Sequence, residues 1–453
     1  RPAGFVSYRE IGNEDLFGVL KDMELANLVR GKSSREILLI TGIYAREDGT
    51  GDSGVIRDAP QQLLVEVLAK ELEKNYSFAL FVAERGTATK EVVYVLERQG
   101  FIRPHMADEN DKRTIYMVDM HEPLMFLHNL DTTIKEPFAS NPAVLDAVEK
   151  NHKKLQIAMT KLYPGNLVLS LSSGIMYHRL VDRITALNDV PREPLVPRRL
   201  GKNMCVPFGK ILRGKVVPNT VTKTLHTDKV YEPDLNSFTI EPFPYYSPLK
   251  SQIETIKSFD RPVILVDDLV HTANRLQVLV PQLREDGIPI KKVVVGVLSG
   301  YGRDLMQCLK VPVESIYSMP NLRQWFVEST LYPFIGGDTV RREEMKVAGL
   351  QPSINMILPY ATPRLSGCSR EALVEFSACC IENSRDLFQV LEAEYRKMYA
   401  KNLTLSRLSE AVILPLCPDK GSCMEYDENL AASVYLENDL ETLWRMKEFL
   451  IKG

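Results

Sequence analysis

A short motif in the middle of the chain constrains the fold more than any other feature. Residues 263–266 are four consecutive apolar residues, and this short, partly β-branched run indicates a buried strand. Asp267 and Asp268 follow at the carboxyl end of the strand, where open α/β sheets bind ligands. Residues 272–275 then open a helix, whose free backbone N–H groups suit a phosphate. The motif therefore predicts a phosphate site beside two carboxylates that accept hydrogen bonds from sugar hydroxyls.

This motif resembles the binding motif for phosphoribosyl pyrophosphate (PRPP) in type I phosphoribosyltransferases. The shared pattern is four apolar residues, two acids, two apolar residues and a phosphate loop of small residues. The resemblance implies that Asp267 and Asp268 hold the ribose hydroxyls and take part in catalysis. It also implies a site for the ribose and 5′-phosphate formed by the acid pair and the following loop, His271, Thr272, Ala273, Asn274 and Arg275. The alternative is a buried strand that simply ends in an acidic turn.

Two segments upstream fit the same family in the expected order. Ser172, Ser173 and Gly174 follow an apolar strand and precede a helix, where the family keeps its pyrophosphate loop. Residues 192–229 carry nine Lys and Arg against two acidic residues. The end of this segment, residues 223–229, resembles the family's mobile basic loop, which closes over pyrophosphate.

The resemblance of the basic loop implies roles for three of its residues. Lys223 and His226 are predicted to act in catalysis, and Lys229 to bind pyrophosphate together with Ser172–Gly174. Preplaced cations of this kind stabilise the negative charge that a leaving pyrophosphate gathers. A solvated basic hairpin and a nucleic-acid patch are the alternatives.

Phosphoribosyl transfer is the reaction that the resemblance implies. PRPP would be the substrate, and Mg²⁺ would bridge pyrophosphate and ribose oxygens rather than bind to protein ligands. Candidates to stack on an acceptor base, with core packing as the alternative, are Tyr301, Trp325, Phe326 and Tyr332.

Three positions depart from the family pattern. His271 stands where a small residue is usual, Ala273-Asn274 replace a Gly pair common in active members, and Pro281 is expected to interrupt the next helix. Since some relatives bind nucleotides without turnover, a non-catalytic nucleotide sensor or scaffold is the main alternative to an enzyme.

A second resemblance precedes the central motif. Residues 46–51 fit Arg-x-x-Gly-x-Gly between a predicted strand at 36–43 and a predicted helix at 59–74. This resembles the pyrophosphate-binding loop of GNAT-superfamily acyltransferases, and residues 78–119 are similar to that family's later strands and helix. The resemblance implies an acyl-CoA site at Arg46, Gly49 and Gly51, in a degenerate or truncated domain. Acyl transfer is thus a third candidate activity, and a plain α/β domain with a Gly-rich surface turn is the alternative.

The last part of the chain is predicted to be mainly helical, with its longest helical pattern at 370–401. No Cys-x-x-Cys pair occurs there, so its cysteines are predicted to be buried thiols rather than metal ligands. These are Cys368, Cys379, Cys380, Cys417 and Cys423.

The sequence therefore predicts an α/β protein of three parts. Residues 1–137 form a small GNAT-like α/β domain, and 341–453 a helical C-terminal region. Residues 138–340 form a phosphoribosyltransferase-like domain, in which strands at 167–171, 263–266 and 292–298 alternate with helices and predict a parallel sheet.

Composition limits the partners and the compartment. With 45% hydrophobic and 25% charged residues the chain is globular, and no apolar run is long enough to span a membrane. The net charge of −3 argues against nucleic acid as the main partner. The resemblance to phosphoribosyltransferases implies a small nucleotide or phosphoribosyl substrate instead. Seven cysteines in 453 residues favour the cytoplasm. A homodimer is left open, and the lack of a starting Met suggests that the chain begins inside a longer one.

Overall fold

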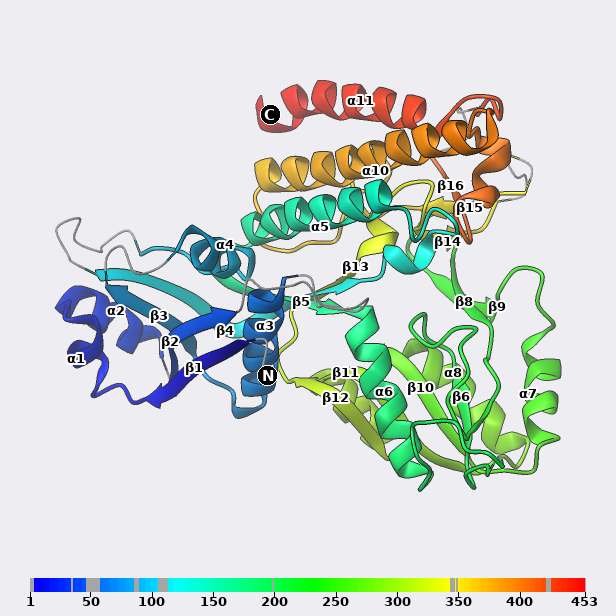
Figure 1. The fold of residues 1–453 in the computed structure, drawn as a ribbon, viewed down its shortest axis with the longest axis horizontal. Coiled ribbons are helices and arrows are strands. Elements are labelled where there is room, and N and C mark those ends of the chain that lie inside the picture. The colour runs from blue at the N-terminus through cyan, green and yellow to red at the C-terminus, as the bar shows by residue number, and fades with distance from the viewer. Residues whose placement is uncertain are drawn as a thin grey trace.

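The fold is an α/β architecture with three sheets, one of them all-parallel, and a largely helical C-terminal stretch (Figure 1). The structure is a computed structural model that describes residues 4–33, 36–45, 58–84, 89–104, 113–197, 199–342, 347, 349–420 and 425–452. The predicted acyl-CoA site at Arg46, Gly49 and Gly51 lies outside the described residues, as does Cys423. Within the described ranges, no helix combines the length and apolar character that crossing a membrane requires.

The first sheet takes its strands from three separate parts of the chain. Its consecutive neighbours are β1 (Gly4–Ile11), β2 (Ile37–Ala45), β3 (Phe78–Glu84) and β4 (Arg113–His128). The second half of β4 lies between two parallel strands, β5 (Asn166–Ser172) and β13 (Gln324–Val327). The predicted strand at 167–171 therefore exists, but its assignment to the parallel sheet was wrong. A short apolar strand followed by a helix does not specify which sheet it joins.

Helices cover both faces of the first sheet because its strands are apolar on both sides. Leu38 and Ile40 of β2 face α3 (Ala59–Glu71) and α4 (Lys90–Arg98). Ile37 and Leu39, which alternate with them, face α1 (Leu16–Leu20) and α2 (Met23–Lys32). A short 3-10 turn, η1 (Leu72–Lys74), ends α3.

The second sheet is the all-parallel one, with strand order β12-β11-β10-β6-β7. The helix α6 packs on one face, and α7 and α8 pack on the other. The strands are β6 (Met204–Pro207), β7 (Val221–Thr222), β10 (Val263–Val270), β11 (Ile290–Ser299) and β12 (Val313–Met319), and the helices are α6 (Ser173–Leu187), α7 (Leu249–Lys257), α8 (Asn274–Glu285) and α9 (Gly300–Cys308).

Pro281 does not interrupt the helix after β10, contrary to the prediction. It lies inside α8, which continues to Glu285. Leu279, Val280 and Leu283 on either side of it are buried against the sheet. Their burial offsets the loss of the one backbone hydrogen bond that proline cannot make.

The third sheet joins the middle of the chain to its end, with order β16-β15-β14-β8-β9. Residues 227–229, expected in a mobile loop, are the first residues of β8 and pair with β9. The strands are β8 (Thr227–Tyr231), β9 (Phe238–Pro242), β14 (Asp338–Val340), β15 (Gln351–Ile354) and β16 (Leu416–Pro418).

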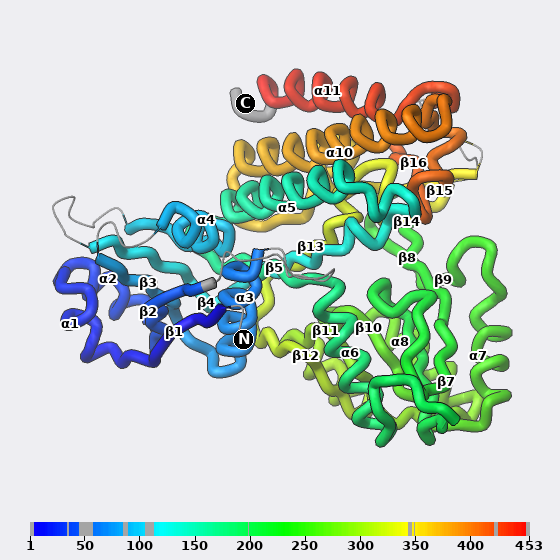
Figure 2. The backbone as a smooth tube through the Cα atoms, in the orientation of Figure 1, coloured from blue at the N-terminus to red at the C-terminus, as the bar shows by residue number. Residues whose placement is uncertain are grey.

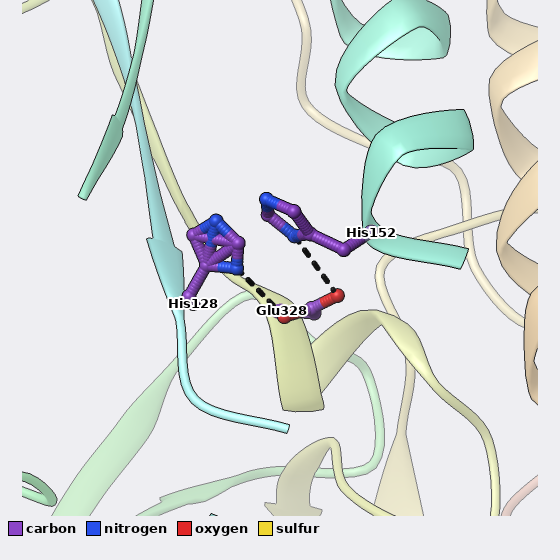
Figure 3. A group of neighbouring side chains, drawn as sticks. All are labelled: His128, His152 and Glu328. Atoms are coloured by element: carbon purple, nitrogen blue, oxygen red, sulfur yellow. Dashed lines mark hydrogen bonds and ion pairs between the residues drawn. The ribbon is translucent and has the colours of Figure 1, made fainter. Parts of the chain in front are cut away.

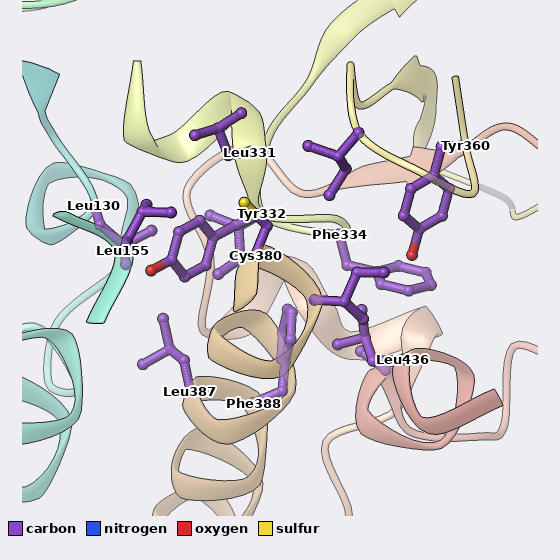
Figure 4. Close-up of a cluster of buried hydrophobic side chains, with 14 of the residues drawn as sticks. Leu130, Leu155, Leu331, Tyr332, Phe334, Tyr360, Cys380, Leu387, Phe388 and Leu436 are labelled. Carbon is purple, nitrogen blue, oxygen red and sulfur yellow. The ribbon is translucent and has the colours of Figure 1, made fainter. Parts of the chain in front are cut away.

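Three long helices form a layer beside these sheets. The helices α5 (Pro142–Leu162), α10 (Arg370–Tyr399) and α11 (Ala432–Lys452) lie side by side, with α10 in the middle (Figures 1 and 2). Their shared core includes Tyr332, Phe334 and Phe388 (Figure 4). The predicted burial of thiols is confirmed for Cys380 and Cys417. Short 3-10 turns complete the fold: η2 (Asp131–Thr133), η3 (Glu328–Leu331) and η4 (Leu405–Glu410).

Candidate functional site

A cleft of about 600 Å³ lies at the carboxyl end of β10. All seven residues predicted to hold the ribose and the 5′-phosphate line it: Asp267, Asp268, His271, Thr272, Ala273, Asn274 and Arg275. The facing walls come from Lys210 after β6, from the β8–β9 hairpin, and from β13 and η3. The cleft thus lies where the parallel sheet meets the first and third sheets.

The two acids of the motif have different environments. The Asp268 carboxylate accepts hydrogen bonds from the backbone N–H groups of Lys210, at 2.6 Å, and Ile211, at 3.0 Å. The Asp267 carboxylate accepts one from the Asp268 N–H at 2.8 Å and lies 3.6 Å from the Arg275 guanidinium. Asp268 therefore holds the segment that follows β6, whereas Asp267 keeps acceptor capacity for a ligand in the cleft.

Asp267 is only 8% exposed, and this burial decides at which pH its carboxyl group ionises. Burial and the neighbouring Asp268 raise the pKa of Asp267 to about 7, against the lowering effect of Arg275. A carboxyl with this pKa changes its protonation state near neutral pH, so the charge of this wall of the cleft depends on pH in that range.

Gly209 and Lys210 belong to this site, although sequence reasoning gave them no role in it. A Cβ atom on Gly209 would lie 2.4 Å from Asp268 Oδ1 and 2.8 Å from Asp267 Oδ1, so a side chain there would displace the acid pair. Lys210 lines the cleft, and burial lowers the pKa of its ammonium group. The available signal was the apolar run 204–207 followed by Phe-Gly-Lys, a second strand end with a glycine and a cation.

The loop after β10 has the geometry of a phosphate cradle. Ala273 adopts a left-handed conformation, with φ 50°, immediately before α8 begins at Asn274. Glycine adopts this conformation without the cost that a Cβ imposes, which explains why a glycine suits the position. The Asn274 amide donates to Thr272 Oγ1 at 2.8 Å and fixes the loop. The first turn of α8, whose leading N–H groups have no partner within the helix, contributes residues to the lining of the cleft.

His271 anchors the loop to the next helix. Ser299 Oγ accepts a hydrogen bond from the Gly302 N–H and lies 2.9 Å from His271 Nδ1. The serine hydroxyl therefore links His271 to the start of α9, and burial lowers the pKa of this histidine, which favours the neutral ring. A residue larger than usual is accommodated here because it bonds to the start of α9.

Only part of the predicted pyrophosphate site reaches the cleft. Lys229 lines it, and its Nζ donates to the Tyr231 hydroxyl at 2.5 Å. Lys223 and His226 are not among the residues lining the cleft. Lys223 bonds through its backbone N–H to Cys205 O of β6, and the His226 ring stacks on Tyr246 at 3.7 Å. Their catalytic role stays a prediction.

The Ser172–Gly174 segment lies elsewhere. Ser172 ends β5 and caps α6, accepting a hydrogen bond from the Ile175 N–H at 3.4 Å, and it lines a separate cavity. Ser173 and Gly174 begin α6. None of the three lines the cleft at β10.

The aromatic candidates divide into cleft and core. Trp325, 39% exposed, and Phe326 line the cleft. Tyr332 is fully buried among the residues of the helical core (Figure 4). Tyr301 is exposed beside His271, with ring centroids 5.9 Å apart. Trp325 is therefore the residue best placed to stack on a planar ligand in the cleft.

The fold and the cleft place the central sheet among the α/β architectures that bind ligands at the carboxyl ends of parallel strands. No protein-family model matches the sequence, and no curated protein matches it. Among solved structures, the chain is distantly similar to a purine phosphoribosyltransferase from Pyrococcus horikoshii Ot3. That match has 12% sequence identity and a TM-score of 0.22, and it covers 34% of this chain and 87% of the other.

Proposed function

We propose that the cleft at β10 binds PRPP or another phosphoribosyl nucleotide and transfers the phosphoribosyl group to or from a base-like acceptor. The observation that carries the proposal is the position of Asp267, a buried carboxylate that lines the cleft directly before a loop and helix start. Ribose hydroxyls would donate to Asp267. The 5′-phosphate would accept from the N–H groups at the start of α8 and from Thr272.

Charge in the facing wall supports a polyanionic ligand. Lys210 and Lys229 come from separate elements and line the same cleft as Arg275. Pyrophosphate, or the diphosphate part of PRPP, would lie between these cations, where partial exclusion of water strengthens the attraction. Trp325 would stack on the acceptor base.

The carboxylates of Asp228, Asp267 and Asp338 line the cleft, but their oxygens are not grouped closely enough to hold an ion by themselves. Mg²⁺ would therefore reach the site bound to the oxygens of the ligand. When bound with the ligand, the ion would offset the negative charge of pyrophosphate. The protein's own part is to orient the ribose through Asp267 and to hold the phosphates apart from bulk water.

Calorimetric titration with Mg-PRPP tests the proposal. We expect the unchanged protein to bind and Asp267→Asn to bind at least about tenfold more weakly, because one charged hydrogen-bond acceptor is lost. Asp260→Asn is the matched control, since Asp260 is an exposed turn residue with φ 50°, a conformation that Asn also tolerates. Absence of PRPP and nucleotide binding by the unchanged protein would overturn the proposal.

A nucleotide sensor without turnover is the second candidate, and one observation favours it. Lys223 and His226, the predicted catalytic residues of the basic loop, are absent from the cleft lining, while the ribose and phosphate residues are present. Radiolabelled PRPP that stays intact with a panel of bases, despite tight binding, would select this candidate. Acyl transfer stays a prediction of the sequence, testable by titration with acetyl-CoA.

A further inference from the structure

A second cavity, of about 240 Å³, lies at the carboxyl ends of three neighbouring parallel strands of the first sheet. His128 is the last residue of β4, Ser172 is its partner at the end of β5, and Glu328 directly follows β13. His152 reaches the same point from α5 (Figure 3). Strand ends of this kind are where open sheets bind ligands, and this cavity is separate from the cleft at β10.

The two histidines converge on one carboxylate. His128 Nδ1 lies 3.5 Å from one oxygen of Glu328, and His152 Nδ1 lies 3.4 Å from the other (Figure 3). One ligand atom from each of the three residues fits within 4.8 Å of the others. Within the described part of the chain, this is the one group of three or more His, Cys, Asp or Glu residues arranged closely enough to hold a metal ion.

The distances between the two Nδ1 atoms and the oxygens of Glu328 suit coordination of a metal ion better than direct hydrogen bonding. Strong N–H···O bonds have lengths of about 2.7–3.2 Å, shorter than either contact to Glu328. Zinc–nitrogen and zinc–oxygen bonds of about 2.1 Å in a tetrahedron place two ligand atoms about 3.4 Å apart. The rings of His128 and His152 have centroids only 2.9 Å apart, so an ion between the three side chains would require these two rings to move apart.

We propose that His128, His152 and Glu328 bind one divalent transition-metal ion of the zinc class, with an open coordination position toward the cavity. Two imidazoles and one carboxylate form a donor set that such ions accept, and three protein ligands leave one position for water or a small ligand. His128 is the ligand most open to the cavity, with its side chain 23% exposed, whereas the side chain of Glu328 is 1% exposed.

The surroundings hold the three ligands in place. Ser170 Oγ lies 2.7 Å from His128 Nε2 and 3.5 Å from His152 Nε2, so it can accept the Nε2 protons while both Nδ1 atoms face the ion. Phe126 stacks on His152, with rings 5.3 Å apart and 7° from parallel. Such contacts fix the tautomer and the orientation of metal-binding histidines.

The segment around Glu328 is fixed as well. Asn129, next to His128, accepts a hydrogen bond from the Ser329 N–H at 2.9 Å and donates to Ser329 Oγ at 2.9 Å. These buried bonds join β4 to η3 on either side of the proposed ion.

The electrostatics of the cavity favour a cation. The Glu328 side chain is only 1% exposed, so its carboxylate lacks the water that would otherwise stabilise a negative charge. Neutral imidazole is the form that binds metal, and an ion would compensate the buried carboxylate. Lys153 also lines the cavity but forms an ion pair with Glu149 at 2.8 Å. Asp131 also lines the wall, as do Asp58 and Glu66, which form ion pairs with Arg98 and with Arg179.

Titration of the metal-stripped protein with Zn²⁺ tests the ion site. We expect one ion per chain, with affinity lowered about 100-fold or more in His128→Gln and Glu328→Gln, since each removes one of three ligands. His121→Gln is the matched control, because His121 also lies on β4 but pairs with Asp119, at 2.8 Å, outside the cavity. Unchanged affinity in His128→Gln, or no stoichiometric binding by the unchanged protein, would overturn the site.

Cobalt spectroscopy separates the ion site from its open position. Co²⁺ in place of Zn²⁺ should give the intense visible bands of a four-coordinate ion, absent in Glu328→Gln, and added azide should shift them. Bands that azide leaves unchanged would overturn the open position. Circular dichroism of the metal-free variants checks that they fold, and Glu328→Gln is expected to fold because it removes a buried charge while keeping the shape of the side chain.

Discussion

Asp267 is the residue at which ligand binding and stability should oppose each other. Its pKa of about 7, against the ordinary 3.8, means that holding this carboxylate ionised in the fold costs up to about 4 kcal/mol above pH 7. Asp267→Asn removes the charge but keeps an oxygen that can accept the Asp268 N–H. That cost already includes the attraction of Arg275 for the carboxylate, and an amide replaces the neutral acid only in part, so we expect a net stabilisation of about 1–3 kcal/mol at pH 8.

The sign of this effect follows from the raised pKa. Below about pH 4, Asp267 is protonated in both the folded and the unfolded chain and costs nothing. As pH rises from about 4 to about 7, the unfolded chain ionises first, so the folded state of the wild type loses stability progressively and then no further. The charged neighbours, Asp268, Arg213 and Arg275, already contribute to this pKa. The stability of Asp267→Asn relative to the wild type should therefore be about 3 kcal/mol more favourable at pH 8 than at pH 4.5.

Urea unfolding followed by circular dichroism at both pH values, without ligand or divalent ions, measures the difference. Asp260→Asn serves as the control and should match the wild type at each pH. The same Asp267→Asn protein should bind Mg-PRPP more weakly, so one substitution would raise stability and lower affinity. A variant less stable than the wild type at pH 8, or a gain of equal size at both pH values, would refute the reasoning.

Three further substitutions should give distinct results. Gly209→Val should lower PRPP affinity by about tenfold or more in calorimetry, because its side chain would displace the acid pair; unchanged affinity would contradict the placement of this glycine. Trp325→Ala should weaken the binding of base-containing nucleotides by about 1–3 kcal/mol but leave the binding of ribose 5-phosphate unaffected. An equal loss of affinity for both ligands would count against stacking. Pro281→Ala should stabilise the protein by about 1–2 kcal/mol in urea unfolding, since alanine restores a helix hydrogen bond; lower stability would show that the ring contributes packing.

The central part of the cleft was predictable because it is local. One strand end, one loop and one helix start are consecutive in the sequence, so the pattern of residues 263–275 sufficed to place Asp267, Thr272 and Arg275 along one cleft. The facing wall was not predictable in this way. Gly209 and Lys210 approach the acids only because β6 is the neighbour of β10, and strand order depends on packing between distant segments.

Ser172 shows that a correct prediction of local structure can still assign a residue to the wrong site. Its strand–serine–glycine–helix pattern was interpreted correctly as local structure, but its strand pairs with β4 and carries it to another cavity. His128, His152 and Glu328 had no local pattern to reveal them. They meet because two strands from separate regions end beside the middle of α5, and no spacing in the sequence encodes that meeting.

The pairing of β13 with β4 also constrains the order in which the chain can fold during its synthesis. Leu124 pairs with Gln324, and the hydrogen bond between Asn129 and Ser329 spans 200 residues. At synthesis rates of about 5–20 residues per second, the second half of β4 waits roughly 10–40 s on the ribosome for its last neighbour. The strands of the parallel sheet lie between β5 and β13 in the sequence. This sheet therefore has time to fold before the first sheet receives its last strand. A nascent chain halted before residue 324 would expose an apolar strand edge to other chains, which makes premature termination a route to aggregation.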